Sequence, residues 1–299
     1  MVKIKVPATT ANIGPGFDTL GMALTLFQEI IIERAEPNIK RIIWPGEPLL
    51  SHDRNLVVKA LERVLKLENA SETGYVLNMF KSDIPISRGL GSSAAAIVSG
   101  IMAANYLLDY RLSMQNMLNI ATEMEGHPDN VAPALLGNLI IAATHNDSIV
   151  FSTIKFPENL NLKVLIPDFE LSTERARSAL PSSYKRSECI YNLSRISFLT
   201  HALLTQNYDN LSIAFSDLIH EPYRYPLIED SSEILIQLSG TNAFGHFISG
   251  AGPTIISVIR DTDTTFDQLL QLDSRSLKHR WQCLTLTVNS SGAQYEQLK

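Results

Sequence analysis

PISRGLGSSAAA, residues 85–96, is the segment that says most about the architecture of this chain. Behind its glycines, residues 94–108 form an apolar run with the three-and-four spacing of a buried helix. The glycines therefore precede a helix N-terminus, with Ser92 or Ser93 as the expected N-cap. Free N–H groups and the positive end of the helix dipole favour anions there, and glycine lets the backbone approach them. The segment predicts a phosphate-binding loop.

Two other phosphate-binding loops have a similar glycine spacing. A Walker A loop requires a lysine after its last glycine, and none follows here. The dinucleotide pattern G-x-G-x-x-G/A is matched by Gly89, Gly91 and Ala94, with Asp109 at the expected acidic position. The predicted strand at 74–80 ends well before the glycines, and no second buried strand precedes Asp109, so the context rejects this match. Spacing alone still allows a tight turn before a buried helix.

Length and composition set broad limits on fold and partners. With 299 residues the chain lies where one hydrophobic core usually gives way to two domains. Hydrophobic residues make up 45% and charged residues 19%, as in globular rather than disordered proteins. The net charge of −6 and the lack of basic runs argue against a nucleic-acid partner. An anionic substrate must then be met by local dipoles, arginines and a metal ion.

The cysteines and the N-terminal residues indicate the cellular setting. Cys189 and Cys283 do not suggest a disulfide framework, so a reducing, cytoplasmic location is expected. Residues 1–7 enter directly into a strand pattern without the core of a signal peptide. The most apolar stretch, residues 94–108, is too short to cross a bilayer, so no membrane partner is expected.

Strand and helix patterns alternate along the rest of the chain, which indicates an α+β or α/β protein. The turn-rich segment 155–159 is the predicted boundary between two domains, 1–155 and 156–299. Strands are predicted at residues 2–6, 22–34, 74–80, 137–144, 149–154, 163–166, 246–249, 254–260 and 284–288. Helices are predicted at residues 54–67, 94–108, 113–126, 172–180, 187–206, 210–219, 231–238 and 263–272, with a short one opening at 126–133.

The full segment 85–96 resembles the phosphate-binding motif of the galactokinase, homoserine kinase, mevalonate kinase and phosphomevalonate kinase (GHMP) superfamily. Four further blocks resemble signatures of the homoserine kinases. They are PATTANIGPGFD at 7–18, GHPDNVAPALLG at 126–137, HEPYR at 220–224 and SGAGPT at 249–254. Because five blocks in the right order span nearly the whole chain, the sequence is identified as a member of this family.

The resemblance implies a two-domain α+β fold. The N-terminal domain would be like domain 2 of ribosomal protein S5, and the C-terminal domain would be ferredoxin-like. It also implies transfer of the γ-phosphate of ATP to the side-chain hydroxyl of L-homoserine, giving O-phospho-L-homoserine for threonine biosynthesis. The active site is expected in the cleft between the domains, with the loop at 249–254 packed against the phosphate loop.

ATP and Mg²⁺ are the implied cofactors. Ser92 or Ser93 offers a hydroxyl to the metal, and Glu125 offers the carboxylate by resemblance to the superfamily's metal-ligand glutamate. Glu123 is the alternative, and only one of the two glutamates is expected at the metal, because helix residues two apart do not share a face. The predicted nucleotide-binding residues are Pro85, Ile86, Ser87, Arg88, Gly89, Leu90, Gly91, Ser92, Ser93, Ala94 and Ala95, with Asn55 toward adenine.

Homoserine carries an ammonium, a carboxylate and a free hydroxyl. Asp18 and Asn12 offer oxygen atoms to the ammonium, and Arg177 and Arg224 offer planar guanidinium groups to the carboxylate. By resemblance, the substrate-binding residues are Asn12, Asp18, His127, Asn130, Thr173, Arg177 and Arg224, and the catalytic ones Asn12, Asn130 and Arg177.

Some members of the superfamily place an aspartate beside the attacking hydroxyl, but the matching position here is Asn130. Because an amide cannot take a proton, no side-chain base is expected, and alignment and electrostatics would provide the rate enhancement. Asp129 is the neighbouring candidate. Its alternative role is to cap a helix start.

Two other functions are weighed against homoserine phosphorylation. Another kinase of the superfamily, for mevalonate or a sugar, would make poor use of Asn12 and Asp18, since mevalonate has no ammonium group. A sensor without turnover would not need intact Ser92, Ser93 and Glu125. A homodimer is expected by analogy with relatives alone.

Overall fold

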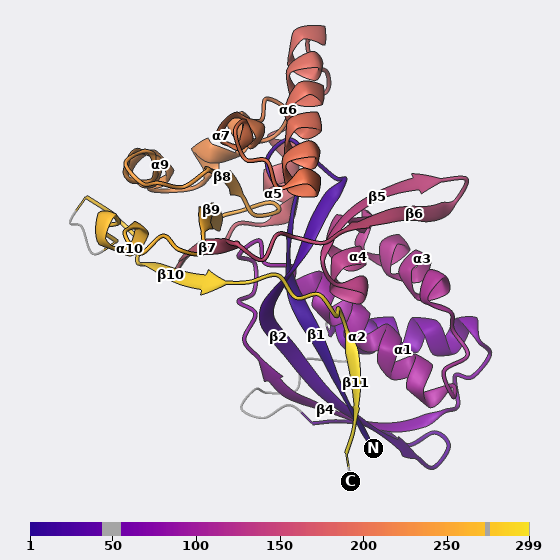
Figure 1. Cartoon of the computed structure of the whole chain (residues 1–299). Helices are drawn as coiled ribbons and strands as arrows, with labels where there is room; N and C mark the ends of the chain where they lie inside the picture. Colours follow the sequence, from indigo (N-terminus) through magenta and orange to yellow (C-terminus); the bar gives the residue numbers. More distant parts are fainter. Residues whose placement is uncertain (44–54, 273–275, 299) are drawn as a thin grey trace.

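The structure is a computed structural model that describes residues 1–43, 55–272 and 276–298 (Figure 1). Its strands are β1 (Val2–Ala11), β2 (Leu20–Ala35), β3 (Lys40–Ile43), β4 (Gly74–Ser82), β5 (Leu139–His145), β6 (Ser148–Ile154), β7 (Leu160–Pro167), β8 (Gly245–Ile248), β9 (Ile255–Arg260), β10 (Trp281–Leu286) and β11 (Gln294–Gln297). Its helices are α1 (Leu56–Leu67), α2 (Ser92–Leu107), α3 (Met114–Glu125), α4 (Pro128–Leu136), α5 (Thr173–Ser178), α6 (Arg186–Thr205), α7 (Leu211–Ala214), α8 (Glu221–Arg224), α9 (Ser231–Ser239) and α10 (Phe266–Leu269), with a 3₁₀ turn η2 (Tyr225–Leu227).

Strand β2 organises the N-terminal unit. One of its edges pairs with β1 in antiparallel register, and the other pairs with β5 near its start and with β4 near its end. Strand β3 joins β4 in parallel, β6 joins β5, and β11 joins β1, which makes a seven-stranded sheet among the described residues. The alternation of apolar and charged residues in β1 gives its first half one buried face and one half-exposed face.

Helix α2 is the centre of the helical layer on this sheet. It is apolar on all sides, which suits a helix enclosed by others, and it contacts α1, α3, α4 and β1. Helices α1 and α2 cross closely because Gly100 has no side chain. A Cβ atom there would lie 2.1 Å from the carbonyl oxygen of Val57 and 2.7 Å from the Cβ of Ala60.

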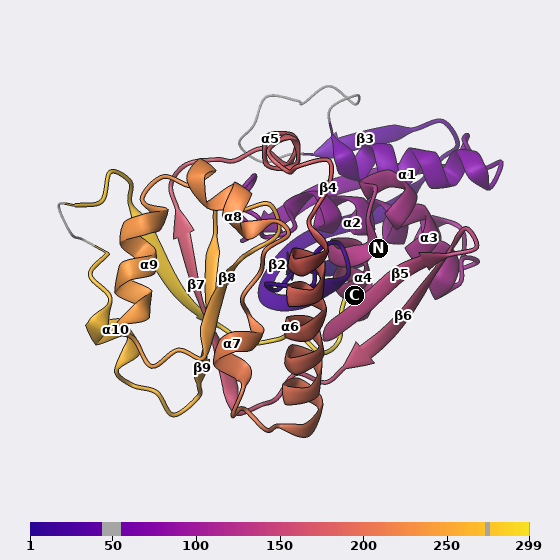
Figure 2. The same cartoon turned by 90° about the horizontal axis from the view of Figure 1, so that it is seen from above.

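The C-terminal unit contains a four-stranded antiparallel sheet in the order β10-β7-β9-β8. Alternate residues of β7 face opposite layers. Leu162 and Val164 belong to the hydrophobic core that continues into the N-terminal unit, whereas Leu165 packs with Phe266 and Trp281 in a separate core. Figure 2 shows the two units side by side, with α6 between the second sheet and the hairpin β5–β6. A shared core therefore joins the units.

Most predicted strands and helices are present, but their ends and lengths differ from the predictions. The predicted helices 210–219 and 263–272 are wrong in length, since α7 and α10 have only four residues each. Strand β3 was not predicted. Residue 54, the predicted start of a helix, lies outside the described residues, and α1 begins at Leu56. Within the described part of the chain, no helix combines the length and apolar character needed to cross a membrane.

The last residues of the predicted second domain, 156–299, pair with the first sheet. Residues Gln294–Gln297 form β11, which pairs with β1 in the first sheet, and Val288 makes an isolated bridge to Leu24 of β2. A four-residue edge strand that buries little surface leaves no periodic hydrophobic signal in the sequence.

Candidate active site

The loop before α2 has the backbone shape that the glycines predict. Gly89 and Gly91 have φ values of +76° and +69°, in the left-handed region. A Cβ at Gly91 would lie 1.9 Å from Thr9 Oγ1, and one at Gly89 would lie 2.3 Å from the carbonyl oxygen of Ser249. Both positions therefore require glycine. A side chain would clash with neighbouring atoms, and the left-handed backbone conformation disfavours other residues. The predicted serine N-cap is wrong: Gly91 is the N-cap, because only its backbone tolerates this turn, and Ser92 is the first helical residue.

The phosphate loop is tied to the C-terminal unit. Ser249 Oγ donates a hydrogen bond of 2.6 Å to the carbonyl oxygen of Gly89, and the Leu171 N–H donates one of 3.2 Å to that of Ser87. The guanidinium of Arg88 donates to the carbonyl oxygens of Pro167 (3.0 Å) and Asp168 (2.8 Å). The expected packing of the loop at 249–254 against the phosphate loop is thus present.

Beside the first turn of α2 lies the half-buried carboxylate of Glu125, at the end of α3. Ser93 Oγ donates a hydrogen bond of 2.7 Å to Glu125 Oε2. Burial raises the pKa of Glu125, although the Ser93 hydrogen bond and the charges of His127 and Arg177 lower it. Glu123 points away to solvent, where it pairs with Arg63 at 2.5 Å.

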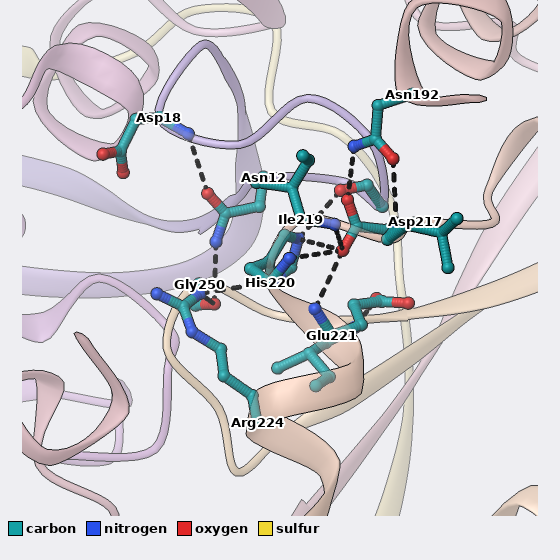
Figure 3. Close-up of polar contacts among 12 residues, drawn as sticks. Asn12, Asp18, Asn192, Asp217, Ile219, His220, Glu221, Arg224 and Gly250 are labelled. Atoms are coloured by element: carbon teal, nitrogen blue, oxygen red, sulfur yellow. Dashed lines mark hydrogen bonds and ion pairs between the residues drawn. The ribbon is translucent and has the colours of Figure 1, made fainter. Parts of the chain in front are cut away.

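The loop after β1 carries Asn12 and Asp18, both with positive φ values (+70° and +52°). The Nδ2 of Asn12 donates to the carbonyl oxygen of Gly250 at 2.8 Å, and its Oδ1 accepts the N–H of Asp18 at 3.0 Å. Arg177 from α5 binds Asp18 in a two-pronged ion pair, with N–O distances of 3.0 and 2.8 Å. Asn12 therefore connects the units through its side-chain amide, which bonds to the backbone of Gly250 (Figure 3). Asp18 connects them through its ion pair with Arg177.

A second arginine reaches the same place from α8. Arg224 is only 1% exposed, and its Nη1 donates to the carbonyl oxygen of Gly250 at 2.8 Å. Burial and the nearby charge of Arg177 lower the pKa of Arg224 to about 10, so it remains a cation at neutral pH. The ring of Phe17 lies near both guanidinium groups, 5.8 Å from that of Arg177 and 5.2 Å from that of Arg224.

The start of α4 supplies three further polar side chains. His127 Nδ1 and the buried carboxylate of Asp129 are in close hydrogen-bond contact. Burial opposes protonation of His127, but the hydrogen bond and charge of Asp129 outweigh it and raise the pKa of the imidazole. Asn130 Oδ1 accepts a hydrogen bond of 2.7 Å from Thr9 Oγ1, which fixes the orientation of the amide.

These side chains line one cavity between the two units. Its walls come from the loop after β1, the phosphate loop and α2, the ends of α3 and α4, α5, α8 and the loop after β8. The residues that line it are Asn12, Asp18, Ser87, Gly89, Gly91, Ser92, Ser93, Glu125, His127, Asp129, Asn130, Leu171, Thr173, Arg177, Arg224, Gly250, Ala251 and Gly252.

The arrangement of the glycine loop, the half-buried carboxylate and the two arginines agrees with what comparisons with known proteins find. The chain matches the family model of the GHMP kinases N terminal domain over residues 55–138 and that of GHMP kinases C terminal over residues 199–271. A homoserine kinase of Clostridium acetobutylicum is 41% identical over 98% of this chain and 99% of its own length. The chain belongs to the homoserine kinase family. A homoserine kinase of Caldicellulosiruptor saccharolyticus is 40% identical over 98% of this chain and 96% of its own length.

A solved structure gives the same answer for the fold. The homoserine kinase of Cytophaga hutchinsonii has a TM-score of 0.88 at 27% identity, covering 99% of this chain and 97% of that one. The two-domain α+β GHMP kinase fold, expected from the sequence blocks, is confirmed. The five homoserine kinase blocks also meet in space, since each contributes residues to the cavity.

Every residue predicted to bind homoserine lines the cavity, but several predicted nucleotide-binding residues do not. Asn55 is buried as the N-cap of α1, where its Oδ1 accepts the N–H groups of Val57 and Val58 at 3.0 and 3.3 Å. Arg88 has its guanidinium on carbonyl oxygens of the C-terminal unit. The others that lie outside the cavity lining are Pro85, Ile86, Leu90, Ala94 and Ala95.

The sequence patterns did not single out Leu171 or Thr9 for this homoserine kinase-family site. Leu171 lines the cavity, and its N–H binds the phosphate loop, but a lone leucine before a helix carries no signal. Thr9 was seen within the first block without a role. Its hydroxyl orients Asn130, a contact across 121 residues that no local pattern could reveal.

Proposed function

We propose that this cavity transfers the γ-phosphate of ATP to the side-chain hydroxyl of L-homoserine, producing O-phospho-L-homoserine and ADP. Membership of the homoserine kinase family supports the reaction. The single observation that carries the site assignment is the Asp18–Arg177 ion pair, because it lies in the same cavity as the glycine loop at the N-terminus of α2.

The phosphates of ATP would bind at the N-terminus of α2. The first N–H groups of a helix have no partners within the helix, and the positive end of its dipole faces an anion placed there. Gly89, Gly91, Ser92 and Ser93 line the cavity at this point, so the backbone is open to the ligand. Arg88 would act on the phosphates through loop placement rather than by direct charge, since its donors are engaged elsewhere.

Ser93 and Glu125 have the chemistry expected of a magnesium site. The hydroxyl and the carboxylate oxygen already lie 2.7 Å apart, and hard oxygen ligands are those that Mg²⁺ prefers. Burial raises the pKa of Glu125, which a nearby dication would reverse. Bound there, Mg²⁺ would neutralise charge on the phosphates. A second group of possible metal ligands has its ligand atoms within 4.8 Å of one another, and consists of Asp18, His127 and Asp129. In this group Asp18 is already engaged with Arg177.

A zwitterion fits between Asp18 and Arg177. Without substrate, the carboxylate and the guanidinium neutralise each other in the cavity. The ammonium of homoserine would take over Asp18, and its carboxylate would take over Arg177 and face Arg224, so that each buried charge keeps a partner. Asn12 fixes the position of Asp18 by accepting its N–H. Mevalonate or a sugar would leave Asp18 without a cation.

The proton of the homoserine hydroxyl is not assigned to a side-chain base. Asn130 offers an amide that Thr9 holds in place, and the carboxylate of Asp129 is engaged by His127. The side chains of this site would act by alignment and electrostatics, with the proton leaving to phosphate or solvent. If Asp129→Asn lowered kcat by several orders of magnitude, about 10³-fold or more, and Asn130→Asp did not, the assignment would be wrong.

The experiment that tests the function is ADP release with each candidate acceptor. L-homoserine, L-serine, mevalonate and galactose are compared with and without Mg²⁺. We expect turnover with homoserine that depends on Mg²⁺ and little above background with the others. Equal ADP release with and without homoserine would reject the proposal and favour the sensor alternative. We also propose a cytoplasmic location, whereas the homodimer stays a prediction by analogy.

A further inference from the structure

The carboxylate of Asp217 is fully buried behind the cavity and does not line it. Its Oδ2 accepts three backbone N–H groups in succession, from Ile219 (3.1 Å), His220 (2.7 Å) and Glu221 (2.8 Å). Its Oδ1 accepts a hydrogen bond of 2.5 Å from Nδ2 of Asn192, in the middle of α6 (Figure 3). The carboxylate therefore organises the turn that leads into α8.

This turn needs an external partner because α8 is only four residues long. A helix this short is unstable by itself, and its first N–H groups have no partners within it. The residue at its N-cap position, His220, makes no side-chain capping bond. Asp217 supplies the missing acceptor, and Asn192 completes the turn by accepting the Leu218 N–H at 2.9 Å.

Two side chains connect this turn to the cavity, and one of them, Arg224, lines it. His220 and Arg224 are four residues apart, so they share one face of the helix. His220 Nε2 lies 2.9 Å from the carbonyl oxygen of Gly14, in the loop that carries Asn12 and Asp18, and its Nδ1 lies 3.4 Å from Arg224 Nη1. Burial lowers the pKa of His220 to about 4, so the neutral ring donates from Nε2 and accepts at Nδ1.

We propose that Asp217 is a positioning residue for homoserine binding. It acts through the turn before α8, which sets the guanidinium of Arg224 and, through His220, the loop of Asp18. These two side chains are the ones proposed to hold the carboxylate and the ammonium, so this inference rests on the proposed function. ATP binds on the other wall of the cavity, at the N-terminus of α2, and its affinity should not depend on Asp217.

Hydrogen-bond complementarity makes the idea testable. In Asp217→Asn, one oxygen can still accept the three N–H groups, but the new amide then points its NH₂ at the NH₂ of Asn192. Asn192 cannot turn over, because its Oδ1 is needed by the Leu218 N–H. The paired exchange Asn192→Asp with Asp217→Asn restores every donor to an acceptor, since the new carboxylate at position 192 accepts from the new amide at position 217.

The test measures initial rates with varied homoserine and varied ATP for wild type, Asp217→Asn and the paired exchange. We expect Asp217→Asn to raise the KM for homoserine by about 10- to 100-fold with the KM for ATP unchanged. The paired exchange should recover most of this loss. Asp230→Asn is the matched control, because Asp230 accepts the N–H groups of Lys278 and His279 and lies outside the cavity lining. It should lower Tm and leave both KM values unchanged.

Several results would overturn the inference. An unchanged KM for homoserine in Asp217→Asn, or an equal rise in both KM values, would show a structural role alone. A folded paired exchange without recovery would also reject it. Should Asp217→Asn not fold, Asn192→Ala, which removes one bond to the carboxylate, must still raise the KM for homoserine selectively. Wild-type turnover of homoserine is measured first, so a failure of the proposed function is recognised separately.

Discussion

At the scale of single residues, the cavity holds buried and half-buried charges that keep one another in place. Asp18 with Arg177 and Asp129 with His127 are pairs, whereas Glu125 has a hydroxyl as its hydrogen-bond partner. A buried carboxylate without a cationic partner is costly, and a metal ion offsets that cost. Among the residues that the structure describes, Glu125 has no such ion pair, whereas its neighbour Glu123 is paired with Arg63, so Glu125 is the better candidate for a metal ligand.

Glu125→Gln should abolish most activity, while Glu123→Gln should not. The first change removes the half-buried carboxylate beside Ser93, and the second removes an exposed group paired with Arg63. We expect kcat to fall by about 100-fold or more in Glu125→Gln and the Mg²⁺ requirement to rise, because losing the proposed metal ligand should cost at least as much as losing an outer-shell partner. Titrating Mg²⁺ in steady-state assays of both variants tests which glutamate binds the metal. Equal losses in the two would contradict the assignment.

The His127–Asp129 pair predicts a pH dependence of stability. The pKa of His127 is raised above the ordinary value of 6.5, so the folded state binds its proton more tightly than the unfolded state does. The stabilisation is complete below the unfolded pKa and is lost as pH rises through the raised pKa. The Tm difference between wild type and His127→Gln should therefore be larger at about pH 6 than at about pH 8.

His246 provides the opposite control for that experiment. Burial lowers its pKa below 6.5, so wild type loses stability relative to His246→Gln as pH falls through the unfolded value. The two variants should thus show pH trends of opposite sign in the same thermal denaturation series. Parallel trends would mean that the His127–Asp129 contact does not favour the protonated imidazole.

At the scale of helices and strands, Gly100 decides how closely α1 and α2 pack against each other. Replacing a helical glycine by alanine normally stabilises a protein by about 0.5–1 kcal/mol. At Gly100 the new Cβ would lie 2.1 Å from the Val57 carbonyl oxygen. We expect Gly100→Ala to lower the free energy of unfolding by about 1–3 kcal/mol instead, measured by urea denaturation.

Gly240→Ala is the control for the same measurement. Gly240 has a negative φ of −85°, and its nearest atom to a new Cβ is 3.4 Å away. Its free energy of unfolding should change by less than about 0.5 kcal/mol. If Gly100→Ala were as mild as Gly240→Ala, the two helices would have room to separate, and the close crossing would not be a constraint.

The sequence predicted those elements that have a periodic core face and failed for those that depend on distant contacts. Residues 94–108 and 187–206 were recognisable because each has a helical run of sufficient length. The predicted helix at 210–219 ends at Ala214, and Asp217 binds the N–H groups of residues 219–221 in a separate turn. Strand β3 has only four residues and depends on its neighbour β4.

The candidate site follows the same division. The blocks at 7–18, 85–96 and 126–137 named most of the cavity lining, since residue identity and spacing carry the family's chemistry. The orientation of the side chains was not predictable. The direction of Arg88 depends on its contact with Pro167, which only the folded chain brings near. The role of Asn55 depends on its bond to Val57 in the folded helix.

At the scale of the whole molecule, the two units are joined by a common core and by bonds across the cavity. Leu162 and Phe247 of the second sheet belong to the same core as β1 and α2. Ser249 and Arg88 then tie the phosphate loop to the C-terminal unit. The position of the phosphate loop therefore depends on residues of both units.

Arg88→Ala should weaken ATP binding without removing a direct phosphate contact. Loss of the bonds to Pro167 and Asp168 frees the loop, so we expect the KM for ATP to rise by about tenfold, or 1.4 kcal/mol, and Tm to fall. Arg175→Ala is the control, since it removes an equal charge from the exposed side of α5. An equal rise in both variants, without a change in Tm, would indicate long-range electrostatics instead.

The pairing of β11 with β1 bears on how the protein is made. The two chain ends lie close together (Figure 1), and the partner of Val2 in the ladder is Gln297. Ribosomes deliver the chain from its beginning, and leading domains usually mature while synthesis continues. Here the outer edge of β1 stays open until residues 294–297 have been synthesised. Chains that lack these residues therefore expose that edge to chaperones and proteases.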